Sequence, residues 1–153
     1  MDIKNIKSPL QFTGLRVSNF NFSTKEFNDK NSQVEVNYKI DFDTNDYKEN
    51  NGNLSAKFIF IVKIEAYSNG ESVFNLFFDI ESKYYCSDIS FDKELFLNSI
   101  QFNGIINCGQ FSRNYLRSVL LLAGVNPIID LPLLDPNKML QEKLNQKSKP
   151  YNT

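Results

Sequence analysis

The chain has 153 residues, a length typical of one domain, and its 17 basic and 18 acidic side chains leave a net charge of −1. This balance argues against a nucleic-acid partner, because neutralising phosphates requires a strongly basic face. The sequence also has no histidine, which removes the commonest general base and metal ligand, so we predict no catalytic residue, no metal site and no cofactor.

The first three-fifths of the chain have the pattern of strands. Between residues 34 and 43, apolar and polar side chains alternate strictly, which is typical of a strand with one buried face. Residues 54–66 keep every even position apolar, and residues 74–81 alternate in the same way. Asn69 and Gly70, between these two runs, form the strongest short signal for a tight hairpin turn because both accept a positive φ angle.

Two weaker features complete the expected sheet. A first strand is expected near residues 14–22, and residues 45–53 have the composition of a polar loop between the second and third strands. Together these elements predict a four-stranded antiparallel meander.

The last third of the chain has a helical pattern. A short helix is expected over residues 92–100, and a better one over residues 111–123, ended by Gly124. A last helix is predicted to begin at Pro136, with Asp135 as its N-cap. The predicted fold class is therefore α+β, with two main C-terminal helices packed on one face of the sheet.

The chain is expected to form one domain over residues 1–145, followed by a flexible polar tail over residues 146–153. No apolar run reaches the length of a membrane helix, and residues 1–7 lack the apolar core of a secretory signal. Cys86 and Cys108 are too few for a disulfide framework and lack metal-ligand spacing. We therefore expect a cytoplasmic protein with reduced cysteines and no membrane partner.

The predicted helix at 111–123 has apolar side chains on two sides, whereas one sheet face can cover only one of them. We therefore expect self-association through this helix, with an interface formed by Phe111, Tyr115, Leu116, Val119, Leu120 and Ala123. The 14 Phe and 7 Tyr also exceed what one small core needs. Two interpretations stay open: self-association that uses the whole apolar surplus, or an additional exposed aromatic groove that binds polypeptide.

Three features follow one another along the chain. They are Lys-Ile-Asp-Phe-Asp-Thr at 39–44, the hairpin from Ala66 to Glu71, and Arg113 followed by Gly124, Pro127 and Leu-Pro-Leu-Leu-Asp at 131–135. In this order they resemble the bacterial export chaperone family SecB, over roughly residues 10–145. The resemblance implies a cytoplasmic homotetramer, a dimer of dimers with its long helices sandwiched between two sheets. It also implies ATP-independent holding of unfolded or pre-secretory polypeptides in long apolar grooves, without catalysis.

A client-binding groove is accordingly predicted between the second strand and the linker with the last helix. Its expected lining is Phe27, Val34, Tyr38, Leu131, Leu133, Leu134, Met139 and Leu140. Aromatic side chains and methionine suit such a groove because they bind many sequences by contact area rather than by directional recognition.

The sequence departs from the family's export members at the surface that contacts the motor ATPase SecA. Those members carry acidic residues at the end of the first strand, where this chain has Asn19 and Ser23, and their acidic tail is replaced by one with Lys147 and Lys149. We therefore expect at most weak binding to SecA. One alternative function is that of the related SecB-like proteins that guard an aggregation-prone antitoxin in a toxin–antitoxin system. A further alternative is a structural homo-oligomeric assembly protein without client binding.

Overall fold

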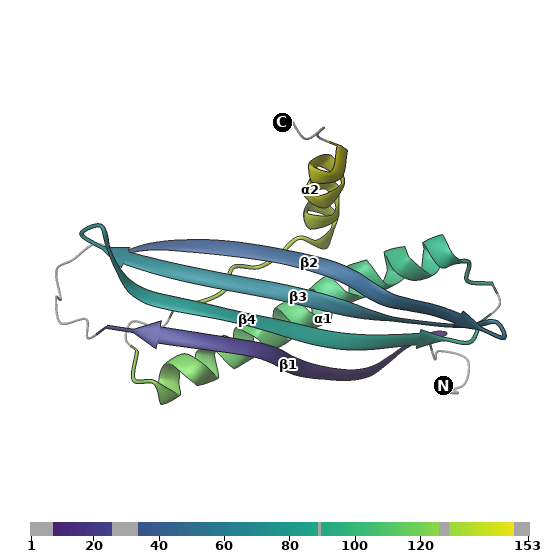
Figure 1. The fold of residues 1–153 in the computed structure, drawn as a ribbon, viewed down its shortest axis with the longest axis horizontal. Coiled ribbons are helices and arrows are strands. Elements are labelled where there is room, and N and C mark those ends of the chain that lie inside the picture. The colour runs from purple at the N-terminus through teal and green to yellow at the C-terminus, as the bar shows by residue number, and fades with distance from the viewer. Residues whose placement is uncertain (1–7, 26–33, 89, 126–128, 149–153) are drawn as a thin grey trace, which may run out of the picture.

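The computed structural model describes residues 8–25, 34–88, 90–125 and 129–148 as a four-stranded antiparallel sheet with two helices (Figure 1). The predicted α+β class is confirmed. The elements are β1 (Leu10–Thr24), β2 (Val34–Asn50), β3 (Asn53–Ser68), β4 (Glu71–Cys86), α1 (Lys93–Leu122) and α2 (Pro136–Ser148).

Two Asn-Gly turns join the three strands that follow β1. Asn69 and Gly70 connect β3 to β4, as predicted, and both have positive φ angles, 52° and 81°. Asn51 and Gly52 connect β2 to β3 with φ angles of 51° and 76°, so the polar loop predicted at 45–53 is wrong. β2 continues to its end through a bulge between Asn45 and Lys48, which lets a polar edge strand stay paired without regular alternation.

The strand order is β1-β4-β3-β2, so the predicted meander is also wrong. β1 pairs with β4 and not with β2, which gives three hairpin-connected strands plus one that returns beside the last, as in a Greek key. The physical reason is the apolar content of β4: Phe20 lies opposite Phe78 and Phe22 lies opposite Leu76. No two-residue turn ties β1 to β2, so side-chain packing decides its partner.

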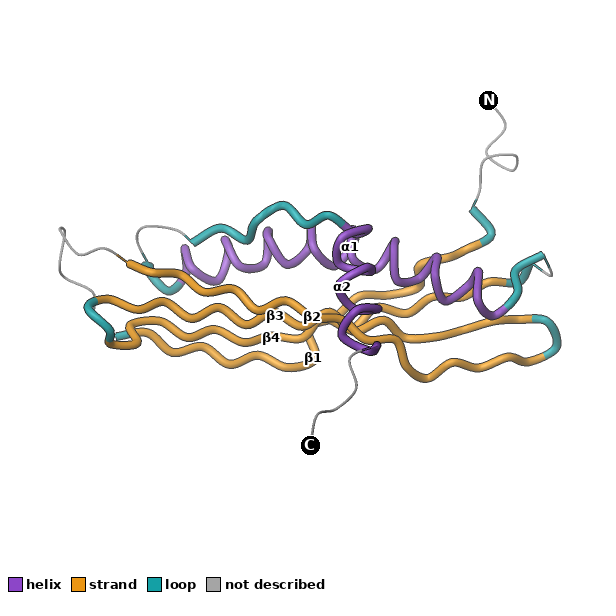
Figure 2. The backbone as a smooth tube through the Cα atoms, turned by 90° about the horizontal axis from the view of Figure 1, so that it is seen from above, coloured by secondary structure: helices purple, strands orange, loops and turns teal. Residues whose placement is uncertain are grey.

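One face of the sheet packs against α1 and forms the core (Figure 2). Every even residue of β3 is buried, and so is every even residue of β4 from Phe74 onward. α1 approaches β3 so closely at Gly104 that a Cβ atom there would lie 2.6 Å from the Phe58 ring. The odd residues of these strands form the opposite face, which we call the open face.

α1 is one continuous helix of 30 residues, whereas the sequence predicted two segments, 92–100 and 111–123. The Asp92 carboxylate caps its start by accepting a hydrogen bond from the Leu95 amide at 2.8 Å. Small residues at Gly104, Cys108 and Ser112 break the apolar pattern, but they are buried against the sheet and so belong to the helix interior. The predicted end at Gly124 is confirmed, with a φ angle of 68°.

α2 lies at the β2 edge of the sheet and projects beyond it, rather than packing on the sheet face as predicted (Figures 1 and 2). Asp135 caps its start, as predicted, by accepting hydrogen bonds from the amides of Asn137 and Lys138. Among the described residues of α2, Met139 and Leu140 are the hydrophobic ones that pack partly buried against the core, and such a narrow apolar side cannot cover a sheet. The helix runs to Ser148, into the predicted tail; residues 149–153 lie outside the described ranges. Among the described residues, no helix is long and apolar enough to span a membrane.

Candidate binding groove

A groove opens where the edge strand β2 faces α2 and the linker that precedes α2. The linker is defined here as residues 129–135. We call this groove the β2–α2 groove, and its cavity has a volume of about 260 Å³. The lining residues are Tyr38, Ile40, Asp41, Phe42, Leu134, Met139, Glu142, Lys143 and Gln146.

The floor of the β2–α2 groove is formed by apolar side chains of β2. Tyr38, Ile40 and Phe42 lie opposite the buried Ile64, Val62 and Phe60 of β3 and therefore face the helix side of the sheet. Tyr38 is 39% exposed and Ile40 is half-buried, while Phe42 is buried. The second strand therefore presents one aromatic and one aliphatic side chain that no element covers completely.

A charged rim borders this apolar floor. The Lys143 ammonium of α2 forms an ion pair with the Asp41 carboxylate and lies 5.4 Å from the centre of the Phe42 ring. The Lys143 side chain is only 23% exposed, so its methylene stem lies over the apolar wall while its charge reaches Asp41. This pair anchors the middle of α2 to the edge of β2.

The linker is held in place by polar contacts with α1 and β2. The Arg117 guanidinium donates two hydrogen bonds to the Asp130 carboxylate, at 2.7 and 3.0 Å, and the Tyr38 hydroxyl donates to the Asp130 carbonyl at 3.0 Å. Arg113 donates to the Leu131 carbonyl at 2.9 Å. The hydrogen bonds from Arg117 hold the pKa of Asp130 below its usual range. Partial burial, and then the nearby Asp130 charge, raise the pKa of Tyr38.

The structure brings together three of the eight residues predicted to line a groove: Tyr38, Leu134 and Met139. Two others are close by but turned elsewhere, since Leu131 is 1% exposed in the core and Leu133 is 84% exposed. Their predicted roles in client binding stay predictions, except that a buried Leu131 cannot contact a client without rearrangement.

The remaining three predicted groove residues lie apart from this set. Leu140 is half-buried against the core, Val34 lines a separate hollow with Tyr67 near the β3–β4 turn, and Phe27 lies outside the described residues. Ile40 and Phe42 line the groove as well, although the sequence pattern was not expected to place them there. The signal for both was present, because residues at i, i+2 and i+4 from Tyr38 share its face of the strand.

The residues predicted for an oligomer interface on α1 divide into two groups. Leu116 and Leu120 are completely buried within the chain, so they are core residues and our assignment of them to an interface is wrong. The reason is the gradual rotation of the buried stripe along α1, which turns these two positions toward the sheet. Phe111, Tyr115 and Val119 are half-buried, and Ala123 is exposed.

The apolar surface that α1 leaves free in the single chain lies at other positions. Leu121 and Leu122 are 64% and 90% exposed at its C-terminal end, and Leu95 and Phe102 are 48% and 39% exposed in its N-terminal half. Tyr115, by contrast, is enclosed by the rings of Phe111, Phe78 and Phe20, with centroids 5.5 to 5.9 Å away. The free surface therefore lies in the N-terminal half of α1 and at its C-terminal end.

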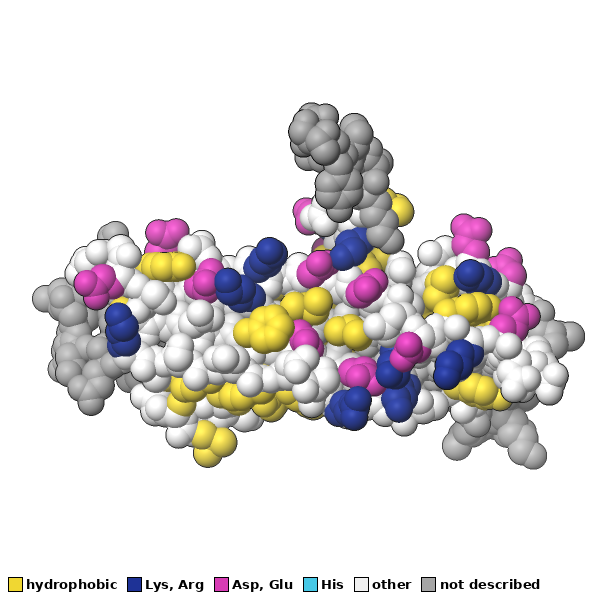
Figure 3. Space-filling model, in the orientation of Figure 1, with side chains coloured by type: hydrophobic (Ala, Val, Ile, Leu, Met, Phe, Trp, Pro, Cys, Tyr) yellow, Lys and Arg dark blue, Asp and Glu magenta, His cyan; other side chains and the backbone are white. Residues whose placement is uncertain are grey.

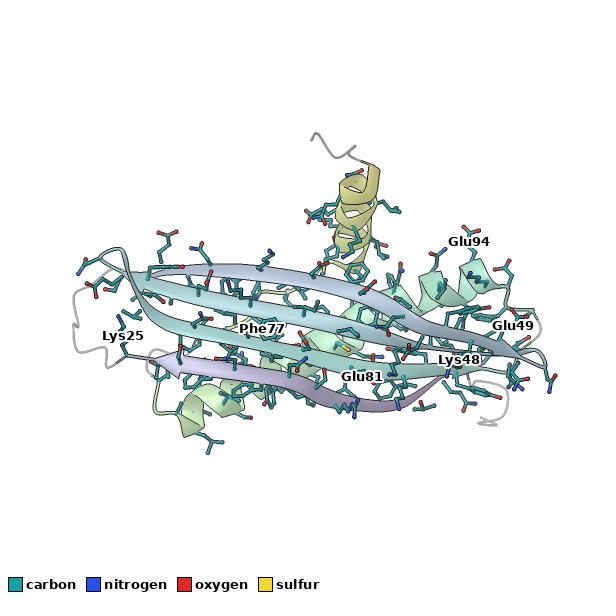
Figure 4. All side chains as sticks on the ribbon, in the orientation of Figure 1. Lys25, Lys48, Glu49, Phe77, Glu81 and Glu94 are labelled. Carbon is teal, nitrogen blue, oxygen red and sulfur yellow. The ribbon has the colours of Figure 1, made fainter. Side chains whose placement is uncertain are left out.

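The open face of the sheet mixes charges with small apolar patches (Figure 3). One ion-pair chain crosses all four strands, from Arg16 through Glu81 and Lys57 to Asp46, with contacts of 3.0, 3.6 and 2.7 Å. Glu81 and Phe77 both project from β4 on this face, away from α1 (Figure 4). The hydrogen bond from Arg16 lowers the pKa of Glu81 despite its burial.

Two features of the described part of the chain concern metal-ligating and nucleophilic side chains. No group of three or more Cys, Asp or Glu side chains there could hold a metal ion. Both cysteines are buried, and burial raises the pKa of the Cys108 thiol to about 11, which keeps it protonated and unreactive.

Comparison with known proteins rests on structure alone, because neither a protein-family model nor a curated protein sequence matches the chain. Among solved structures, the chain aligns with a SecB-like chaperone from Mycobacterium tuberculosis, in complex with a ChAD peptide from the HigA1 antitoxin. The TM-score is 0.65 at 10% identity, and the alignment covers 82% of this chain and 90% of that one. The chain has a SecB-like fold. The resemblance inferred from the sequence is confirmed at this level.

A second solved structure, a protein of unknown function from Streptococcus agalactiae, aligns with a TM-score of 0.41 at 8% identity, over 81% of this chain and 97% of that one. Within the SecB-like fold of the present chain, the β2–α2 groove lies at the β2 edge, whereas the exposed apolar residues of α1 lie in its N-terminal half and at its C-terminal end. The groove and these exposed residues are therefore two different parts of the surface.

Proposed function

We propose that this SecB-like protein is an ATP-independent holdase, which binds extended apolar segments of unfolded or pre-secretory polypeptides in the β2–α2 groove and keeps them from aggregating. The observation that carries the proposal is the apolar floor of that groove on a SecB-like fold. The proposal requires neither catalysis nor a cofactor.

The size and chemistry of the groove favour a polypeptide over a small molecule. Its volume of about 260 Å³ lies below the range of ~300–1,000 Å³ that is usual for small-molecule sites, but it suits one or two apolar side chains of a longer segment. Met139 adapts its shape, and Tyr38, Ile40 and Phe42 supply contact area along the strand. Such a surface selects for apolar character, not for one sequence.

The proposal is tested by the aggregation of a chemically unfolded client, followed by light scattering in the absence of nucleotide. The wild type should suppress aggregation at near-stoichiometric ratios. Combining Leu134→Ala with Met139→Ala removes apolar area from one wall and should weaken the client affinity about tenfold or more, given roughly 0.8 kcal/mol per lost methylene group.

The matched control is Leu144→Ala, which truncates a residue of the same helix that is 67% exposed and does not line the groove. It should suppress aggregation as the wild type does. A wild type that never suppresses aggregation would favour the structural assembly protein without client binding. A double variant as active as the control would place the client elsewhere.

Dedication to one antitoxin is the second candidate function. It is favoured by the solved complex of the Mycobacterium tuberculosis protein, which holds an antitoxin peptide. Competition in the same assay separates the two: a general holdase should release a labelled peptide to many unfolded clients at similar concentrations. A dedicated chaperone should release it only to the antitoxin encoded beside it.

We further propose that the protein acts in the cytoplasm as a homotetramer, a dimer of dimers that self-associates through the exposed apolar residues of α1. Contact with SecA is expected to be weak. Asn19 already donates a hydrogen bond to Asp79 on the open face at 2.7 Å, and Ser23 adds no charge there. The open face therefore offers a basic motor surface little electrostatic attraction.

A further inference from the structure

Asp130 of the linker accepts hydrogen bonds from two elements, α1 and β2. Its carboxylate accepts two hydrogen bonds from Arg117 of α1, and its carbonyl accepts one from the Tyr38 hydroxyl of β2. The next residue, Leu131, is 1% exposed in the core and has its carbonyl bound by Arg113. Four residues after Asp130, the chain reaches Leu134 in the opposite wall of the β2–α2 groove.

We propose that Asp130 is a positioning residue that fixes the separation of the two groove walls, with Arg117 holding its carboxylate and Tyr38 holding its carbonyl. The inference rests on the proposed function. A displacement of Asp130 would release the Tyr38 ring on one wall and would shift Leu134 on the other. A single residue thereby sets the positions of both groove walls.

Because this ion pair is exposed, it can position the linker without contributing much to the stability of the fold. The Arg117 and Asp130 side chains are 55% and 54% exposed, and exposed pairs contribute little to the free energy of unfolding. A two-pronged contact between guanidinium and carboxylate nevertheless restricts orientation strongly. Because the burial of Leu131 already stabilises the linker, the role that remains for the ion pair is to set the orientation of the linker.

A fixed groove binds more tightly because its side chains lose less freedom when a client binds. Removing one hydrogen bond from such a frame typically weakens binding by about three- to tenfold. We therefore expect this loss of affinity without a comparable loss of folding stability.

The test measures the affinity of a short fluorescein-labelled peptide, in which Phe and Leu alternate with Ser and Lys, by fluorescence anisotropy. Tyr38→Phe keeps the ring and removes only the hydroxyl, and Arg117→Asp breaks the ion pair. Each should weaken binding about three- to tenfold while the thermal midpoint stays close to that of the wild type. The charge-swapped pair Arg117→Asp with Asp130→Arg should recover most of the affinity.

The matched control is Glu65→Gln, which breaks the partly exposed contact with Lys63 on the open face, away from the groove. It should leave the affinity unchanged. Equal affinity of wild type, Tyr38→Phe and Arg117→Asp would overturn the inference, and so would a swapped pair that recovers nothing. A wild type that does not bind the peptide would refute the proposed function itself, and the inference would fall with it.

Discussion

At the scale of single residues, two glycines of α1 occupy similar helical positions but meet different surroundings. A Cβ atom at Gly104 would lie 2.6 to 2.8 Å from atoms of the Phe58 ring, whereas one at Gly109 would meet only the Leu134 methyl group at 3.4 Å. Phe58 is fully buried, so its ring cannot move aside freely. The close approach of α1 to Phe58 of β3 therefore depends on the missing side chain of Gly104.

Gly104→Ala is expected to destabilise the protein by about 1–3 kcal/mol, because overpacking outweighs the higher helix propensity of alanine. Gly109→Ala is the control and should be neutral or stabilising, by up to ~1 kcal/mol. Urea unfolding followed by circular dichroism measures both free energies. Equal stabilities of the two variants would contradict the close approach at Phe58.

At the scale of elements, the sequence correctly predicts the features that depend on local residue patterns, such as strand positions, turns and helix starts. Alternation located the second, third and fourth strands, the Asn69-Gly70 turn joined two of them, and Asp135 marked the start of the last helix. The wrong expectations depended on contacts between distant segments. The pairing of β1 with β4 and the unbroken path of α1 both follow from packing that no local pattern contains.

The groove shows the same division. Alternation from Tyr38 predicts the β2 wall, but the position of the other wall depends on Arg117 meeting Asp130, thirteen residues along the chain. The interface prediction failed at Leu116 and Leu120 for a related reason. A helix that follows a twisted sheet changes its buried side along its length, and regular helical spacing does not reveal that change.

Glu81 joins three strands on the open face, and its effect on stability should depend on pH. Its carboxylate is 9% exposed and contacts Arg16 of β1 and Lys57 of β3. Because the pKa of Glu81 is lowered in the folded state, its stabilising contribution is present above the ordinary glutamate range and is lost as the pH falls through the lowered value.

Glu81→Gln should therefore lower the free energy of unfolding by about 1 kcal/mol near pH 7, because Arg16 is largely exposed and screened. The difference from the wild type should shrink below about pH 4. Urea titrations between pH 3 and 7 measure it, with Glu71→Gln at the exposed β3–β4 turn as the control. A difference that is constant over this range would refute the ionic role of Glu81.

At the scale of the whole molecule, substitutions at two nearby leucines can distinguish an effect on folding from an effect on assembly. Leu120 is 0% exposed in the core, whereas Leu122 is 90% exposed at the end of α1. In a single chain this exposed end is costly to keep in water, and a second copy is the partner that a homotetramer would supply. The two positions therefore give a matched pair for testing the proposed self-association.

Leu120→Asp should bury an unpaired carboxylate and destabilise the fold by roughly 4 kcal/mol or more, so that circular dichroism reports unfolding. Leu122→Asp should keep the folded spectrum, because substitutions at exposed positions usually change stability by less than about 0.5 kcal/mol. Its mass by light scattering should fall below that of the wild type, since the charge would then lie in an apolar contact between copies. A wild type that is monomeric at micromolar concentration, or a Leu122→Asp variant of unchanged mass, would remove this end of α1 from the assembly surface.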